Sequence, residues 1–170
     1  EDSDRRNGAG GNDLLDGLGG EDVLEGGNGN DTIFGGDDRD RIYADRETDT
    51  SNAAQDFVYG QGGDDVLAAH AGPAELRGGF GDDDVQGSLG DDYLAGNEGA
   101  DALIGGGGND RMLGGADNDT ADGGTGDDSI TGGDGADILE GGAGGETNGD
   151  TLRGGAGGDH IAAGDLSIGG

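Results

Sequence analysis

The chain has 170 residues and is strongly acidic, with 39 Asp and Glu residues against 8 Lys and Arg residues and a net charge of -31. All eight basic residues are arginines, which excludes a polybasic surface for nucleic acid or anionic lipid. The absence of cysteine excludes disulfides and thiolate metal sites, and no apolar run reaches membrane-spanning length. With 46 glycines and 29% hydrophobic residues, an unstructured acidic linker is the alternative to any fold.

Residues 1–7 form an N-terminal lead-in without a start methionine or a signal-peptide core, so we expect a mature product or an excised segment. From Gly8 the chain divides into sixteen consecutive units, most of nine residues, in the frame Gly-Gly-x-Gly-x-Asp-x-apolar-x. Residues 26–34 and 132–140 are clear copies. A disordered linker has no reason to keep an aliphatic residue two places after each aspartate, so this short period predicts a solenoid.

Each unit combines a glycine-rich turn with a short strand whose central apolar residue points inward. Two units make one coil, which predicts an all-β fold: a parallel β-roll, or β-solenoid, of about eight coils over residues 8–162. Two inward ladders follow. The first contains Leu15, Ile33, Val58, Leu76, Leu94, Met112, Ile130 and Leu152, and the second contains Leu24, Ile42, Leu67, Val85, Leu103, Ala121, Leu139 and Ile161.

Three units depart from the frame, and all three have odd numbers, so the irregularities are expected on one edge of the solenoid. The fifth unit carries an insertion near residues 44–55, and the fifteenth has extra residues near 145–148. The seventh keeps its length but has Ala74 where the others have aspartate. Residues 163–170 resemble a C-terminal partial repeat, and neither end of the chain resembles a cap.

The repeated aspartates indicate a metal site in each stack of turns. Carboxylates and glycine-rich main-chain carbonyls are hard oxygen donors of the kind that calcium prefers. Stacked aspartates would also repel each other unless a cation lay between them. The fifteen aspartates predicted as ligands are Asp13, Asp22, Asp31, Asp40, Asp56, Asp65, Asp83, Asp92, Asp101, Asp110, Asp119, Asp128, Asp137, Asp150 and Asp159.

The repeated frame resembles the calcium-binding RTX, or hemolysin-type, nonapeptide repeat family, whose fold is the parallel β-roll. The resemblance covers residues 8 to about 162. It implies a cage in which one turn gives the carbonyls of its second and fourth positions, the next turn on that edge gives those of its first and third, and both aspartates contribute. For the second and fourth units this set is Leu18, Gly20, Asp22, Gly35, Asp37 and Asp40. Leu18 stands where glycine is usual.

Carried along the chain, the resemblance implies a set of main-chain carbonyl ligands. They belong to Ala9, Gly11, Leu18, Gly20, Gly26, Asn28, Gly35, Gly36, Asp37, Asp38, Gly60, Gln61, Gly62, Gly63, Gly78, Gly79, Phe80, Gly81, Ser88, Gly90, Gly96, Asn97, Glu98, Gly99, Gly105, Gly106, Gly107, Gly108, Gly114, Gly115, Ala116, Asp117, Gly123, Thr125, Gly132, Gly133, Asp134, Gly135, Gly154 and Ala156.

These sites predict about 10 to 14 calcium ions, which would neutralise most of the -31 charge. Because the apolar ladders are one residue thick, metal binding is expected to supply much of the folding free energy. On the even edge we expect seven ions in an unbroken row from Asp22 to Asp159, and on the odd edge an interruption around Asp56 and Ala74.

The remaining sequence features are weaker indications of function. His70 and His160 fit no nucleophile or zinc spacing and are interpreted as surface turn residues. No lysine or helix follows Gly105–Gly108 to suggest a phosphate loop, and a thin solenoid offers no hydrophobic pocket for a catalytic acid, so we predict no enzyme activity. Outward aromatics at Phe34, Phe57, Tyr59 and Tyr93 are either covered by the 44–55 loop, which we favour, or a protein-partner patch.

The sequence thus favours a non-enzymatic calcium-binding structural module of a secreted or cell-surface protein, with calcium as its partner. In the related family, such repeats stay unfolded during type I export and fold on meeting calcium outside. One alternative is a subunit of an extracellular filament or matrix, with copies stacked end to end. In that case Asp159 and Asp165 of one copy would share ions with Asp13 and Asp22 of the next. Another alternative is the repeat tail of a secreted hydrolase or toxin.

Overall fold

The computed structural model describes residues 3–45, 54–142 and 149–162, and the strands in these ranges wind into a parallel β-solenoid. The strands are β1 (Arg5–Gly10), β2 (Leu14–Gly19), β3 (Val23–Asn28), β4 (Thr32–Asp37), β5 (Arg41–Tyr43), β6 (Asp56–Gly62), β7 (Val66–Ala68), β8 (Ala74–Phe80), β9 (Asp84–Gln86), β10 (Tyr93–Glu98), β11 (Ala102–Gly107), β12 (Arg111–Ala116), β13 (Thr120–Thr125), β14 (Ser129–Asp134), β15 (Ile138–Glu140), β16 (Thr151–Ala156) and β17 (His160–Ala162).

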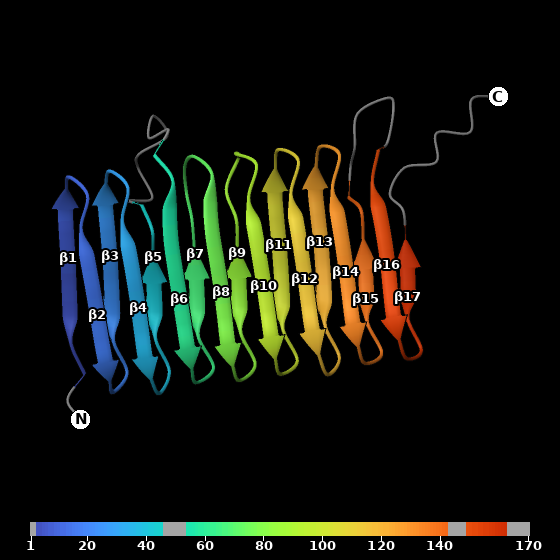
Figure 1. The fold of residues 1–170 in the computed structure, drawn as a ribbon, viewed down its shortest axis with the longest axis horizontal. Helices are drawn as coiled ribbons and strands as arrows, with labels where there is room; N and C mark the ends of the chain where they lie inside the picture. The colour runs from blue at the N-terminus through green and yellow to red at the C-terminus, as the bar shows by residue number, and fades with distance from the viewer. Residues whose placement is uncertain (1–2, 46–53, 143–148, 163–170) are drawn as a thin grey trace.

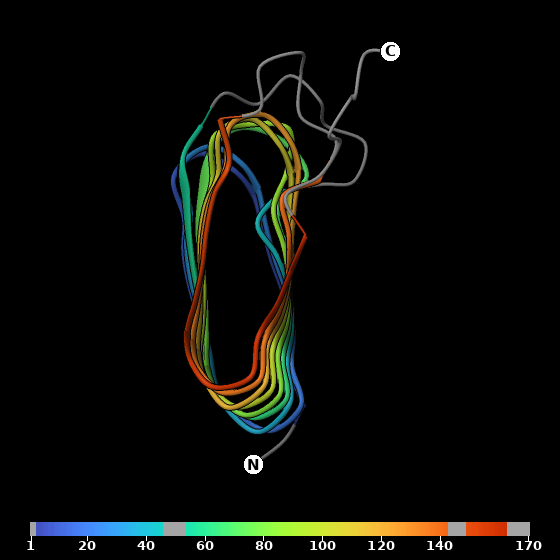
Figure 2. The same ribbon diagram turned by 90° about the vertical axis from the view of Figure 1, so that its right-hand side faces the viewer.

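The odd-numbered strands form one parallel sheet and the even-numbered strands form the other. Successive strands alternate between the two sheets, and the turns between them lie along two edges (Figure 1). We call the lower edge in this view, formed by turns of even-numbered units, the even edge, and the upper one the odd edge. Viewed along the solenoid axis, the coils superpose as a flattened ring (Figure 2). The predicted fold is confirmed.

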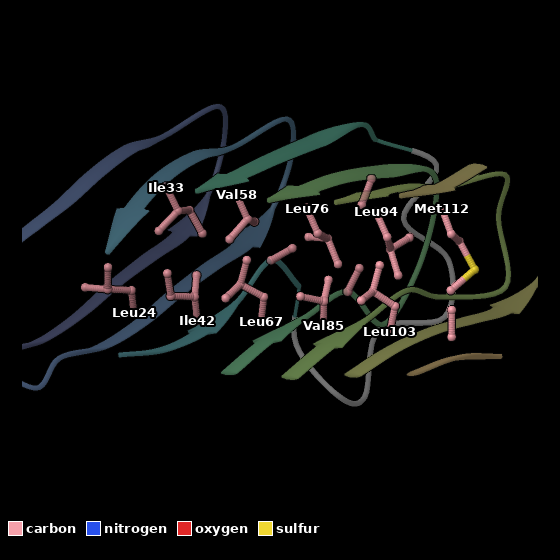
Figure 3. Packing of buried hydrophobic residues seen from close by; sticks show 14 of the residues in the cluster. Leu24, Ile33, Ile42, Val58, Leu67, Leu76, Val85, Leu94, Leu103 and Met112 are labelled. Carbon is pink, nitrogen blue, oxygen red and sulfur yellow. The ribbon is translucent and has the colours of Figure 1, made fainter. Parts of the chain in front are cut away.

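Both predicted apolar ladders form the core between the sheets. Leu15 pairs with Ile33 in one sheet and Leu24 with Ile42 in the other, and the same register continues through the later coils. Figure 3 shows the two rows of side chains pointing toward each other. From Leu24 to Leu139 the ladder residues are almost completely buried. The rows become exposed only at the C-terminal end of the described chain, where Ile161 is 45% exposed.

The N-terminal lead-in contributes a strand that the repeat pattern did not indicate. β1 begins at Arg5 and pairs with β3, so that Arg6 occupies the ladder position next to Leu24. The guanidinium of Arg6 donates to the main-chain oxygen of Asp16 on the opposite sheet, and it pairs with the carboxylate of Asp4 at 2.7 Å. A charged side chain therefore covers this end of the apolar core, although the sequence analysis expected no cap here.

Many strands extend into the glycine-rich part of the repeat, so they are six or seven residues long and longer than the short strand expected from the repeat frame. Parallel pairing continues in this part of the repeat, where Gly27 pairs with Ala9 and Gly36 pairs with Leu18. Among the described strands, β5, β7, β9, β15 and the last strand, β17, have only three residues. β5, β7, β9 and β15 lead into the fifth, seventh, ninth and fifteenth units, which are the irregular units of the odd edge and the unit that carries Ser88.

The second and fourth positions of the repeat need glycine because the main chain there is left-handed. In the third unit, φ is 105° at Gly27 and 121° at Gly29. Residues with a Cβ adopt this conformation at a cost of about 1–2 kcal/mol. A few units nevertheless place one there, as at Leu18 with φ 81°.

Candidate metal sites between the turns

A ladder of aspartates runs along the even edge. Each aspartate of this row projects toward the preceding turn, where its Oδ1 accepts the main-chain N–H of the aspartate one coil earlier. Seven such hydrogen bonds of 2.7–3.3 Å connect the eight aspartates from Asp22 to Asp159 without a gap. An eighth bond, from Asp4 N–H to Asp22 Oδ1 at 2.6 Å, extends the row into the lead-in.

The corresponding ladder on the odd edge is interrupted. Its bonds run from Asp13 to Asp56, resume at Ala74 and continue to Asp150. Ala74 has no carboxylate that could accept the main-chain N–H of Asp56 on the preceding turn. Its own N–H donates to Asp92 Oδ1 at 2.7 Å, so the main chain of the seventh unit keeps its place in the stack. The asymmetry of the two carboxylate rows agrees with the sequence pattern.

The second carboxylate oxygen of most repeat aspartates is buried without any hydrogen-bond partner. This holds for Oδ2 of Asp13, Asp22, Asp31, Asp40, Asp56, Asp65, Asp83, Asp101, Asp110, Asp119, Asp128, Asp137 and Asp150. An unpartnered buried carboxylate oxygen is costly. The recurrence of such an oxygen in turn after turn is an arrangement that a positively charged ligand would satisfy.

Asp92 differs from these thirteen aspartates. Its Oδ2 accepts the N–H of Ser88 at 2.6 Å and the hydroxyl of Ser88 at 3.1 Å. Ser88 stands at the second position of the ninth unit, where most units have glycine. The protein itself thus satisfies the carboxylate that faces Ala74.

Burial changes the acidity of these carboxylates. Desolvation raises the pKa of Asp56, Asp83, Asp110 and Asp119 to about 7, with neighbouring aspartates adding to the increase. It raises the pKa of Asp40, Asp65 and Asp101 to about 6. Hydrogen bonds from main-chain N–H groups act in the opposite direction but do not cancel the effect. Without a cation, these aspartates are therefore reluctant to ionise.

The gap between the sixth and eighth units shows how main-chain carbonyls contribute oxygen atoms to a candidate metal site. The carbonyls of Gln61 and Gly63 point toward the later turn, where they lie 2.2 and 2.1 Å from the Cβ positions that Gly79 and Gly81 lack. The carbonyl of Gly78 points back, 2.6 Å from the corresponding point at Gly60, and that of Phe80 accepts the N–H of Gly63 at 2.8 Å.

Two carboxylates face this same gap. Asp65 Oδ2 lies 2.4 Å from the missing Cβ of Gly60, and Asp83 Oδ1 accepts the N–H of Asp65 at 2.8 Å. Four carbonyls and two carboxylates thus converge between one pair of turns, from the positions that the family resemblance implied. An all-oxygen set of six suits calcium. In the described residues no group of three or more His, Cys, Asp or Glu side chains could hold a metal, so any such site depends on the main chain.

The predicted residues all lie in the described turns, but that they bind calcium stays a prediction. The aromatics lie on the outer face of the even-numbered sheet, where Phe34 stacks on Tyr59 with ring centroids 5.1 Å apart. Arg77 lies 5.1 Å from the ring of Tyr93. Residues 46–53, which were expected to cover these rings, lie outside the described residues, as do 145–148 and 163–170.

Sequence reasoning missed a second polar ladder at the fifth position of the repeat. There Asn and Asp side chains reach toward the later turn, for example when Asn12 Oδ1 accepts Asn30 N–H at 3.1 Å and Asp64 Oδ1 accepts Asp82 N–H at 3.1 Å. The recurrence of Asn and Asp just before the repeat aspartate was the available signal. These side chains fix the exposed end of each turn.

The described residues contain no helix that is long and apolar enough to cross a membrane. A search of curated proteins finds no match to this chain. The family model of the RTX calcium-binding nonapeptide repeat (4 copies) matches residues 7–42, 16–50, 51–73, 77–112, 113–145 and 145–165. These matches cover most of the sequence, and the repeated turns and the β-solenoid agree with them. The chain therefore belongs to the family of RTX calcium-binding nonapeptide repeats.

Proposed function

We propose that this chain is a calcium-binding structural module that folds when calcium fills the gaps between its turns. The observation that carries the proposal is the set of thirteen buried aspartate oxygens without a hydrogen-bond partner, which lie along both edges. A cation in each gap would satisfy these oxygens and reduce the repulsion within a chain of net charge -31. The proposed ligands are the repeat aspartates and the main-chain carbonyls of the facing turns, for a total of about 10 to 14 ions.

Magnesium is a poor substitute in this proposal. It demands a small octahedral cage at 2.0–2.1 Å and retains much of its water. Here the donors are set by the spacing of stacked coils, roughly 4.8 Å. Calcium accepts longer distances and irregular sets of six to eight oxygens. The ion is structural in this proposal, and the turns supply oxygen ligands for it.

We further propose that the parent protein is secreted or displayed at the cell surface. Repeat proteins of this family are typically exported by type I systems. Extracellular calcium modules bind with dissociation constants of about 10⁻⁴ to 10⁻³ M, so sites of that strength would fill outside the cell and stay empty inside it. A chain that remains unfolded in the cytoplasm and folds on meeting calcium fits such an export route.

We infer a single module rather than end-to-end assembly. In a filament, the apolar ladder of one copy would continue into the next, but Arg6 occupies the ladder position at the N-terminal end. Its guanidinium would have to be buried against the apolar residues of the neighbouring copy. A repeat tail attached to a hydrolase or toxin is compatible with the same solenoid, and sequencing of the complete gene decides that point.

The test is far-ultraviolet circular dichroism of the purified chain in chelator, in millimolar calcium and in millimolar magnesium. We expect a largely disordered spectrum in chelator, β structure in calcium and little change in magnesium. Sedimentation in the calcium buffer adds the oligomeric state, for which we expect a monomer. Equal folding in magnesium, or full β structure in chelator at neutral pH and low ionic strength, would contradict the proposal.

A further inference from the structure

The gap between the fifth and seventh units lacks the carboxylate that the other gaps receive from the later turn. Ala74 stands in the place of that aspartate. Asp56, on the earlier turn, nevertheless has the same environment as its counterparts: it is 1% exposed, and its Oδ2 has no hydrogen-bond partner. By the repeat pattern alone, this buried oxygen would have no second carboxylate with which to share a cation.

A carboxylate from outside the repeat pattern occupies this gap. Asp45 follows Ala44 at the start of the fifth unit and is 1% exposed. Its Oδ2 accepts the N–H of Ala71, in the facing seventh unit, at 3.3 Å. The side chain therefore reaches from the earlier turn to the later one, in the opposite direction to a repeat aspartate.

The surroundings of Asp45 hold it in this position. Its main-chain oxygen lies 3.3 Å from Nδ1 of His70, and the ring of His70 stacks on Tyr43 with centroids 6.1 Å apart. Tyr43 immediately precedes the turn, at the end of β5. Two aromatic rings and a main-chain hydrogen bond thus fix a buried carboxylate that no repeat motif requires.

The carboxylates of Asp45 and Asp56 lie side by side. The two side chains are within hydrogen-bonding contact, and the charge of Asp45 acts directly on Asp56. Two buried carboxylates in contact repel each other strongly unless a proton or a cation lies between them. The next gap on this edge is different, because Ser88 satisfies Asp92 there.

We propose that Asp45 replaces the aspartate missing at Ala74 and, together with Asp56, binds a calcium ion between the fifth and seventh units. The gap between Ala74 and Asp92 then remains without an ion. This inference rests on the proposed calcium-binding function but assigns a ligand that the nonapeptide motif does not contain. It also moves the interruption of the odd edge by one coil, from the gap between Asp56 and Ala74 to the gap between Ala74 and Asp92.

The test is the number of calcium ions bound by the folded chain, counted by native mass spectrometry at saturating calcium. We expect Asp45→Ala to bind one ion fewer than the wild type. Asp84→Ala is the matched control, because Asp84 is an exposed residue of β9 outside every gap, and its loss removes the same charge. The control is expected to keep the wild-type number. A second variant, Asp45→Ala with Ala74→Asp, returns a carboxylate to the gap from the usual position and is expected to regain the lost ion.

The outcomes separate this inference from the proposed function. If the wild type binds no calcium, the proposed function itself fails. If the wild type binds calcium and Asp45→Ala binds the same number of ions, the role of Asp45 is rejected while the repeat sites stand. Should Asp45→Ala not fold in calcium, the double variant decides the matter: folding with the wild-type ion count supports the site, and failure to recover that count overturns it.

Discussion

At the scale of single residues, the repeat combines two requirements. Its first glycine must lack a side chain so that a carboxylate oxygen can lie against the main chain, and its sixth residue must supply that oxygen. At Gly17, an added Cβ would lie 2.4 Å from Asp22 Oδ2 and 2.1 Å from the carbonyl of Gly35. The glycine thus creates the space into which the oxygen donors of two turns point.

A pair of glycine substitutions in β6 tests this role. A Cβ at Gly60 would lie 2.4 Å from Asp65 Oδ2 and 2.6 Å from the carbonyl of Gly78, whereas one at Gly62 would meet its nearest atom at 3.9 Å. We expect Gly60→Ala to destabilise the calcium-bound fold by about 1–3 kcal/mol through overpacking and to raise the calcium concentration at the folding midpoint. Gly62→Ala is expected to change neither the stability of the calcium-bound fold nor the calcium midpoint by much. Equal midpoints in a calcium titration would contradict the account.

The acidity of the buried aspartates leads to a pH-dependent prediction for the metal-free chain. The folded-state pKa values of about 6 to 7, for example at Asp65 and Asp83, lie above the ordinary aspartate value of about 3.9. Between about pH 4 and pH 7 the folded state therefore binds more protons than the unfolded state, so its stability falls as the pH rises. In chelator, we expect circular dichroism to show more β structure near pH 4 than at pH 8.

In the presence of calcium, the pH dependence of folding is expected to reverse. Calcium binds the ionised carboxylates, so protons compete with it below about pH 7, and the calcium midpoint should increase as the pH falls. A metal-free spectrum that is unchanged from pH 4 to pH 8, or a calcium midpoint that does not depend on pH in this range, would show that the buried aspartates do not control folding.

At the scale of strands and turns, irregular sequence is gathered on one edge. The even edge repeats the same carboxylate contact from Asp22 to Asp159. On the odd edge, the short strands β5, β7, β9 and β15 lead into the irregular turns. The regular edge can therefore maintain the stack while the other carries insertions.

This difference predicts unequal effects of equivalent substitutions. Asp101→Asn interrupts the continuous even row, where Asp101 Oδ1 accepts the N–H of Asp83 and its Oδ2 has no partner. Asp92→Asn acts at a carboxylate already satisfied by Ser88. We expect Asp101→Asn to remove at least one bound ion and to raise the calcium midpoint clearly more than Asp92→Asn. Native mass spectrometry and a calcium titration measure the two effects, and equal losses would contradict the difference between the edges.

The repeat period was sufficient to predict the strand alternation, the two apolar ladders and the repeat aspartates, because each depends on a fixed spacing. The roles of Arg6, Asp45 and Ser88 could not be predicted in this way. Asp45 contacts Ala71, 26 positions later in the sequence, across an insertion of irregular length. Arg6 acts through its position at the end of the core, and Ser88 acts through the hydrogen bonds of its N–H and hydroxyl to Asp92. These depend on packing and not on the period.

At the scale of the whole molecule, the core is long and thin. Each coil contributes one apolar side chain from each sheet, as Figure 3 shows for the rows that contain Leu24 and Ile33. The two buried side chains of a coil are too few to offset the ordering of its whole backbone. Hydrogen bonds between the coils and, in our proposal, the bound ions supply the remainder.

A substitution in the middle of the core tests how far the coils depend on each other. Leu94 is fully buried and pairs with Leu76 and Met112 on the neighbouring strands. Leu94→Ala leaves a cavity and is expected to destabilise the calcium-bound fold by about 2–5 kcal/mol. Because each coil contacts only its neighbours, hydrogen exchange should increase most around β8, β10 and β12. A uniform increase over all described strands would indicate a fully cooperative unit instead.

The most direct measurement of the central claim is an anomalous diffraction map from crystals grown in calcium. We predict a row of seven ions on the even edge, one in each gap between the aspartates from Asp22 to Asp159. On the odd edge we predict an ion beside Asp56 and none between Ala74 and Asp92. A folded solenoid with no anomalous signal between its turns, or with ions bound only to exposed carboxylates outside the gaps, would contradict the account.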